Sequence, residues 1–351
     1  MAALVAYRGL TLTDNIDDYP EGIILPVDKP YRWTSADVIR KLKYQAIKHF
    51  HKKNLKVGHA GTLDPLATGV LLVCIGKATK LAEELQASPK QYLAGVTFGA
   101  STPSYDLEKE IDRLLPLDGV SEAALRSVLP GFVGEQNQVA PLFSAKSVDG
   151  VRAYEMARRA YKEAQRSGLP FDHAATGLLT RQSITIYSLE LENFFPAGSQ
   201  APLNRLAPCD GFVSKVEGMG PENCATLGNI RGGDPSLAMG GAERSEAFSG
   251  PIPSPGDEAG HDKPSPGDET ENTENQGKSG RIHVADISAY DLPTAMVRVD
   301  CSKGTYIRAL ARDLGEALGS GAFLSSLRRT RNGGIPVEAA LSLPDALSLL
   351  G

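Results

Sequence analysis

The chain has 351 residues, 41% of them hydrophobic, and a formal net charge of −5 at pH 7, which is ordinary for a globular protein in solution. Apolar runs such as Val70–Ile75 are far shorter than the roughly 20 residues that cross a bilayer, and Met1–Leu10 lacks a signal-peptide pattern, so we expect a cytoplasmic protein without membrane contact. The four cysteines are far apart and form no CxxC pair, which argues against a zinc site or a disulfide framework.

Apolar periodicity predicts a mixture of helices and strands along the chain. After a strand over Gly22–Val27, Ser35 is expected to cap a helix whose apolar positions, among them Val38 and Leu42, recur at helical spacing. The remaining expected elements are, in chain order, a strand over Val70–Ile75, a helix over Thr79–Leu85, a strand over Gln91–Phe98, helices over Ser121–Leu129 and Val151–Ser167, strands over Ser183–Phe194 and Ala295–Asp300, a helix over Thr305–Leu318 and a short helical tail over Leu341–Leu350. These elements do not alternate as regular βαβ units, and no GxGxxG motif follows a predicted strand, so the sequence indicates an α+β fold rather than a dinucleotide-binding fold.

The segment Pro196–Gly280 differs in composition from the rest of the chain. It holds 15 glycines and 10 prolines, repeats the hexapeptide Pro-Ser-Pro-Gly-Asp-Glu, and carries 6 Lys/Arg against 13 Asp/Glu. Such a composition cannot bury enough apolar surface to fold alone, so we expect a long disordered insertion, either a tolerated surface loop or a functional segment. The expected division is an N-terminal extension over residues 1–21, an ordered domain in two parts over 22–195 and 281–351, and the acidic insertion over 196–280.

Outside the insertion the chain is mildly basic, with 31 Lys/Arg against 29 Asp/Glu. The positive charges gather in two clusters: Arg40, Lys41, Lys43, Lys48, Lys52, Lys53 and Lys56 in the first, and Arg328, Arg329 and Arg331 in the second. Clusters of this kind supply the salt-dependent part of nucleic-acid affinity, but they are also typical of solvated helix faces. Both interpretations are open at this stage.

A single carboxylate stands in a glycine-punctuated loop directly before an apolar strand. Gly58, Gly61 and Gly69 permit backbone angles that other residues avoid. Pro65 biases Asp64 toward an extended conformation and so fixes the direction of its side chain. The loop has the character of an active site, while an ordinary Asp-Pro turn is the plainer alternative.

Read whole, the stretch GHAGTLDPLATGVLLVCIGKATKL, residues 58–81, resembles the catalytic motif of the TruB family of tRNA pseudouridine synthases. Three further blocks resemble the family's other motifs, and all four occur in family order over residues 22–195 and 281–345. These blocks are Val27-Asp28-Lys29-Pro30 with Trp33-Thr34-Ser35, then Ala140–Lys146 with Asp149–Tyr154, and finally Cys301–Arg308 with Asp313–Gly315 and Leu327–Arg329. Chance agreement of four ordered blocks is improbable.

The resemblance implies a pseudouridine synthase fold, with a mixed, mostly antiparallel central sheet flanked by helices. It also implies an isomerase, an intramolecular transferase that uses neither a metal nor a cofactor. Asp64 is then the essential carboxylate, Arg308 its ion-pair partner and Tyr92 the active-site tyrosine. Whether Asp64 attacks the sugar or assists elimination at the sugar is open. Without the resemblance, a helical arginine usually faces solvent and a strand tyrosine usually belongs to the core.

Five further residues take expected roles from the resemblance. They are Tyr306 and Leu327 in the pocket wall, His59 beside a flipped-out nucleotide, Asp106 as a support for the arginine, and Lys29 as either a phosphate contact or a support for the aspartate loop. Base flipping enters because a uridine in a folded RNA loop is stacked or paired and must leave that position before it can react.

The expected partner is tRNA, through its TΨC stem-loop, with the uridine at position 55 as the target and a monomeric enzyme. No C-terminal PUA-type RNA-binding domain is evident before Gly351, so we expect Val139–Arg159 and the basic clusters to face the RNA. Two alternatives are weighed against this hypothesis: a non-catalytic tRNA-binding or folding module, and a synthase for another RNA.

Overall fold

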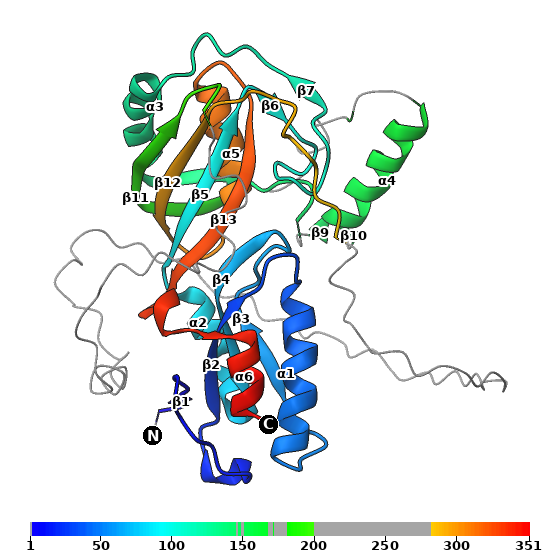
Figure 1. Ribbon diagram of the computed structural model, residues 1–351, viewed down its shortest axis with the longest axis vertical. Helices are drawn as coiled ribbons and strands as arrows, with labels where there is room; N and C mark the ends of the chain where they lie inside the picture. Colours follow the sequence, from blue (N-terminus) through cyan, green and yellow to red (C-terminus); the bar gives the residue numbers. More distant parts are fainter. Residues whose placement is uncertain (1, 145–146, 149–150, 168–170, 172–180, 200–281) are drawn as a thin grey trace, which may run out of the picture. The chain divides into compact units, whose positions relative to one another are not determined.

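The computed structural model describes residues 2–144, 147–148, 151–167, 171, 181–199 and 282–351. Within these residues the chain forms one large mixed sheet with helices packed on it, together with two small two-stranded sheets (Figure 1). The expected α+β class is therefore confirmed. From residue 200 onward, the expected disordered insertion lies outside the described residues.

Neighbouring strands of the large sheet follow the order β1-β2-β4-β13-β5-β12-β11-β8, with β3 on β4, β14 on β13 and β15 on β2. The strands are β1 (Leu4–Val5), β2 (Ile23–Lys29), β3 (Val57–Ala60), β4 (Ala67–Ile75), β5 (Lys90–Phe98), β8 (Gly134–Val139), β11 (Arg181–Phe195), β12 (Thr294–Cys301), β13 (Ala322–Asn332), β14 (Ile335–Pro336) and β15 (Leu341–Ser342). The small sheets pair β6 (Ala100–Ser101) with β7 (Arg113–Leu114) and β9 (Ser147–Val148) with β10 (Val151–Arg152). Within the described residues, β1 with β2, β4 with β13 and β15 with β2 are the parallel pairs, so the mostly antiparallel sheet is confirmed.

The expected helices are present, with shifted ends. They are α1 (Ser35–His49), α2 (Ala82–Ala87), α3 (Glu122–Val128), α4 (Ala153–Ser167), α5 (Ile307–Ala317) and α6 (Leu343–Leu349). The helix expected over Thr79–Leu85 begins as a 3-10 helix, Gly76–Leu81, and becomes α-helical only at Ala82. Helix α5 packs on β13, while α1 contacts β4 and α6.

The N-terminal cap of α1 differs from the expectation. Thr34, not Ser35, is the cap: its hydroxyl accepts from the Asp37 N–H at 3.0 Å, and the Asp37 carboxylate accepts from the Thr34 N–H at 3.2 Å. The buried hydroxyl of Ser35 instead donates to the Leu63 carbonyl at 3.1 Å and accepts from the Leu63 N–H at 3.0 Å. Helix α1 thereby holds the chain one residue before Asp64.

The first residues of the chain belong to the domain core. Strand β1 extends the sheet parallel to β2, and Ala6, Leu12 and Ile16 are buried in the same apolar cluster as the central strands. The expected N-terminal extension over residues 1–21 is therefore corrected: from Leu4 onward the chain is part of the folded domain.

Strand β13 is the main element that sequence reasoning missed, and it lies between β4 and β5 (Figure 1). Arg329 pairs with Gly69 of β4 on one side and with Tyr92 of β5 on the other. Gly69 has a φ of +102°, and a Cβ built there would lie 2.2 Å from the Arg329 carbonyl oxygen. This close approach of β4 to β13 therefore requires glycine.

Substituting this glycine should cost more stability than its backbone angle alone explains. Gly134, with a φ of +107°, offers a matched control because nothing lies within 4 Å of a Cβ built there. Gly134→Ala should lower the free energy of unfolding by about 1–2 kcal/mol, the usual cost of such a backbone angle. Gly69→Ala should lower it by more than about 3 kcal/mol, since a strand must also shift. Urea denaturation measures the free energy of unfolding of both variants. Equal losses in the two would contradict the conclusion that the close approach of β4 to β13 requires glycine.

Candidate active site

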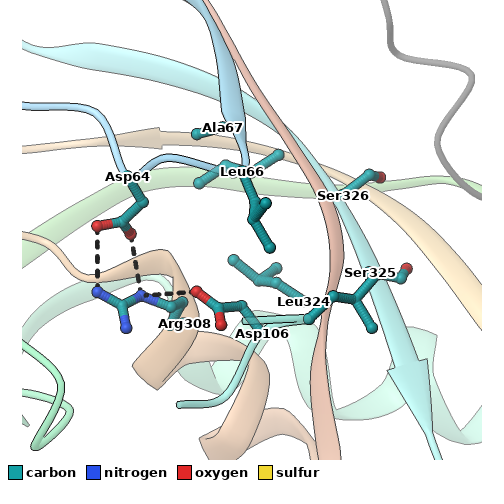
Figure 2. A pocket seen from close by; sticks show the side chains of 10 residues that line it. Asp64, Leu66, Ala67, Asp106, Arg308, Leu324, Ser325 and Ser326 are labelled. Atoms are coloured by element: carbon teal, nitrogen blue, oxygen red, sulfur yellow. Dashed lines mark hydrogen bonds and ion pairs between the residues drawn. The ribbon is translucent and has the colours of Figure 1, made fainter. Parts of the chain in front are cut away.

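Asp64 and Arg308 form the ion pair that the resemblance implied (Figure 2). The Nε of Arg308 donates to one carboxylate oxygen of Asp64 at 2.9 Å, and Nη2 donates to the other at 3.2 Å. Two parallel contacts fix the plane of the carboxylate as well as its position. Asp64 lies in the loop between β3 and β4 and Arg308 in the first turn of α5, so the pair joins positions 244 residues apart.

The guanidinium of Arg308 is enclosed, and protein groups occupy its other donors. The side chain of Arg308 is 6% exposed, whereas that of Asp64 is 38% exposed. Nη1 donates to the Ser104 carbonyl at 3.1 Å and Nη2 also donates to the Phe143 carbonyl at 3.0 Å. Burial acts to lower the pKa of Arg308, but Asp64 and Asp106 raise it above its ordinary value. The arginine is thus a fixed positive charge, and the aspartate keeps a face open to solvent.

Asp106 is the second carboxylate at this guanidinium, as expected. Its Oδ2 lies 3.7 Å from the Arg308 Nε, and its Oδ1 accepts from the Ser104 hydroxyl at 2.6 Å and from the Glu108 N–H at 2.9 Å. Burial raises the pKa of Asp106 to about 6, against the opposing charge of Arg308. At neutral pH it therefore carries a negative charge beside the arginine (Figure 2).

The three residues expected to be catalytic line one open cavity of about 370 Å³. Asp64, Tyr92 and Arg308 share it with Tyr306 and Leu327, the two residues expected in the pocket wall. The roles of all five stay predictions. The volume of this cavity lies within the range of about 300–1,000 Å³ typical of small-molecule sites. The cavity drawn in Figure 2 has only about 20 Å³, room for about one water molecule, so the larger one is the space for a substrate.

Tyr92 belongs to both the core and the cavity. It lies on β5, is 9% exposed and packs in the main apolar cluster, yet it also lines the larger cavity. Burial raises the pKa of Tyr92, and the charge and hydrogen bond of Arg329 oppose this effect. Sequence reasoning did not single out Arg329 as a neighbour of the site.

Lys29 supports the loop that carries Asp64. Its side chain is fully buried, and its Nζ donates to the carbonyls of Pro30, Trp33 and Pro65 at 2.9, 2.6 and 3.2 Å. Pro65 directly follows Asp64, so the lysine ties β2 to the loop. Of the two roles weighed for Lys29, the structure favours support of the aspartate loop over a phosphate contact, because the side chain has no exposed surface.

His59 is half-buried on β3 and does not line either cavity. Its Nδ1 has no hydrogen-bond partner among the described residues. Burial lowers the pKa of His59, and the charge of Arg329 adds to the effect, so the imidazole is neutral at neutral pH. Its place beside a flipped nucleotide stays a prediction.

The two basic clusters differ in how far their side chains are exposed. Every member of the first is exposed, on α1 and the segment after it. In the second, Arg329 is 1% exposed and Arg328 is 11% exposed and paired with Asp28 at 2.7 Å, whereas Arg331 is 48% exposed and paired with Asp300 at 2.7 Å. A role of this cluster in binding phosphate stays a prediction. The expected RNA-facing segment over residues 139–159 lies partly outside the described residues.

This arrangement defines a class of enzyme: one that presents an oriented, solvent-accessible carboxylate to a ligand of roughly nucleoside size. In the part of the chain that the structure describes, no group of three or more His, Cys, Asp or Glu side chains is placed to hold a metal ion. That same part contains no helix with the length and apolar character of a membrane span.

Comparison with known proteins identifies the family. A model of the N-terminal domain of TruB family pseudouridylate synthases matches residues 48–194. A protein from Phocaeicola vulgatus named tRNA pseudouridine synthase B is 32% identical over 326 residues, covering 93% of this chain and 92% of that protein. One of the same name from Bacteroides fragilis is 34% identical over 324 residues, covering 92% of each. The chain therefore belongs to the TruB family of pseudouridylate synthases.

A likeness to solved structures extends over the same region. The crystal structure of a Cbf5-Nop10-Gar1 complex contains a chain that aligns with 95% of this one, with 20% sequence identity and a TM-score of 0.47. The alignment covers 56% of that chain.

The buried lysine should make stability depend on pH. Burial lowers the pKa of Lys29 from 10.5 to about 7, so between these values the folded chain binds fewer protons than the unfolded chain. Its contribution to stability is therefore present at high pH and is lost as pH falls toward 7. The free energy of unfolding of the unaltered chain, relative to Lys29→Met, should rise by about 2 kcal/mol from pH 7 to pH 9.

Guanidinium denaturation at a series of pH values measures this difference. Lys52→Met is the control, because Lys52 is half-exposed and pairs with the exposed Asp17, so its curve should run parallel to that of the unaltered chain. A Lys29→Met curve that is also parallel to that of the unaltered chain would contradict the lowered pKa of Lys29.

Proposed function

We propose that the protein is a tRNA pseudouridine synthase that converts the uridine at position 55, in the TΨC loop of tRNA, to pseudouridine. The observation that carries this proposal is the half-exposed Asp64 carboxylate, held in one plane by the buried Arg308 at a cavity of nucleoside size. The names of the relatives support tRNA as the RNA. The position within tRNA rests on the likeness of the four motif blocks to the TruB family.

The chemistry of the reaction defines what the site must supply. In uridine the ribose C1′ is bonded to N1 of the base, and in pseudouridine it is bonded to C5. One bond breaks, one forms, C5 loses a proton and N1 gains one, so no atom or electron enters from a co-substrate. A carboxylate near the sugar and a proton acceptor near the base are therefore the two groups that the site needs.

Asp64 is suited to the sugar. Whether it attacks C1′ or assists an elimination at the ribose, one carboxylate oxygen must approach the sugar along a fixed direction. The two hydrogen bonds from Arg308 provide that direction, while the Asp106 carboxylate forms a second ion pair with the same guanidinium. Because these groups are enclosed and already hydrogen-bonded, little reorganisation is needed when a substrate enters.

Tyr92 is suited to the base. Its ring forms part of the cavity wall with Tyr306 and Leu327, where an apolar surface can pack against a uracil ring. Its hydroxyl can exchange a proton with the base. The flipped uridine would thus be held between the tyrosine and the carboxylate.

Access to the uridine requires base flipping, which costs a few kcal/mol that RNA contacts must offset. The exposed lysines and the arginine of the first basic cluster supply phosphate contacts of the salt-dependent kind. We propose that the enzyme acts as a monomer. Because the proposed substrate is tRNA, we expect the enzyme to act in the cytoplasm.

Removal of the carboxylate charge should stop the reaction without unfolding the protein. Asp64→Asn keeps the shape and one acceptor for Arg308, so single-turnover formation of pseudouridine in unmodified tRNA transcript should fall by at least about 1,000-fold. The dissociation constant for tRNA should change less than about threefold, because the flipped base is only one of many contacts. Asp313→Asn is the matched control: Asp313 also pairs with an arginine, Arg312, but it lines neither cavity, so its rate should stay within about threefold.

Mapping the modified position separates this proposal from the two alternatives. The proposed synthase gives pseudouridine at position 55 and at no other uridine of the transcript. A non-catalytic module binds tRNA and leaves every uridine unchanged. A synthase for another RNA leaves this transcript unmodified while acting on a different RNA pool, and either result would overturn the proposal.

A further inference from the structure

Arg329 is a buried charged residue that takes part in no ion pair among the described residues. It is 1% exposed, its Nε donates to the Val70 carbonyl at 2.7 Å and its Nη2 donates to the Gly61 carbonyl at 3.1 Å. Among the described residues, its neighbours Arg328 and Arg331 each have a carboxylate within 4.0 Å, whereas no ion pair includes Arg329. Burying an unpaired charge is costly, so a guanidinium kept here calls for a specific counterpart.

The group that faces this guanidinium is the phenol of Tyr92. The two residues are direct cross-strand neighbours on β13 and β5, so their side chains lie on the same face of the sheet, and both line the larger cavity. A guanidinium can only donate, so a hydrogen bond between the two groups is accepted by the phenol oxygen. The hydroxyl hydrogen of Tyr92 then points away from Arg329.

We propose that Arg329 is a positioning residue for Tyr92: its buried guanidinium orients the phenol toward the substrate and carries the positive charge against which the phenol gives up its proton. This inference rests on the proposed function. Once the bond between C5 and C1′ has formed, the phenolate takes the proton from C5 and the electron pair of that C–H bond returns to the uracil ring. The phenol then releases the proton to solvent, and N1 of the base takes one from solvent.

The surroundings of Tyr92 make Arg329 the group that favours the phenolate. Burial raises the pKa of Tyr92, Cys301 on β12 and Asp64 raise it further, and Arg329 lowers it through both its charge and its hydrogen bond. Burial also raises the pKa of Cys301 to about 12, so its thiol is neutral in any assay near pH 8. The other titratable groups that feel the charge of Arg329 are Lys29 on β2, His59 on β3 and Lys90 on β5.

A direct titration of this phenol tests the proposal without RNA. We would replace Tyr92 by 3,5-difluorotyrosine, whose phenol is more acidic, and follow its ionisation by fluorine NMR in the full chain. The midpoint should rise by about one pH unit or more in Arg329→Met and by less in Arg329→Lys, which keeps a charge but not the planar fork. Arg331→Met is the control, since that arginine lies on the same strand and pairs with Asp300; its midpoint should not move.

Activity supplies a second readout that a merely structural arginine would not produce. With the natural tyrosine, Arg329→Met should slow single-turnover pseudouridine formation at least tenfold, and difluorotyrosine at position 92 should recover most of that loss. A midpoint that rises by less than half a pH unit, or a rate that the acidic phenol does not recover, overturns the proposal. Should Arg329→Met fail to fold, Arg329→Gln, which keeps a hydrogen-bond donor but carries no charge, decides by the same criteria. Failure of the unaltered chain to modify tRNA would instead count against the proposed function and leave the titration result standing.

Discussion

The contact between Asp64 and Arg308 is the interaction on which the site depends. Arg308 is enclosed, so its charge is tolerable only while the carboxylates and carbonyls around it stay in place. The chain meets this condition by holding the Asp64 loop from two sides, through Ser35 in α1 and Lys29 in β2. The exposed half of the aspartate is thereby fixed by a buried framework, which is the condition for a preorganised catalytic group.

Strand β13 organises the rest of the cavity. It lies between the strand that follows the Asp64 loop and the strand that carries Tyr92, so its side chains reach both. Each of the two candidate reactive groups has an arginine of its own: Arg308 orients the carboxylate and Arg329 contacts the phenol. In the proposed isomerisation, Arg308 would serve the step at the sugar and Arg329 the step at the base.

Much of the local structure was predictable from sequence because it depends on neighbours in the chain. The apolar spacing of α1 and the apolar run of β4 are signals of this kind, although the cap fell at Thr34 rather than Ser35. The central strand β13 was not predictable, since its run of arginines suggested a surface and only distant carbonyls allow Arg329 to be buried. A period of two along this run, which places Leu327 and Arg329 on one face, was the available signal. The pairing of Asp64 with Arg308 came from family resemblance and not from periodicity.

The proposed roles of Asp64 and Tyr92 are tested most directly by a structure of the protein bound to a TΨC stem-loop that carries 5-fluorouridine at position 55. Fluorine at C5 cannot leave as a proton, so the reaction stops with the nucleoside still in the site. We expect a flipped nucleoside in the cavity of about 370 Å³, with its ribose within about 3.5 Å of the Asp64 carboxylate and its base against Tyr92. A nucleoside that stays stacked in the RNA, or that binds away from Asp64, would contradict these roles.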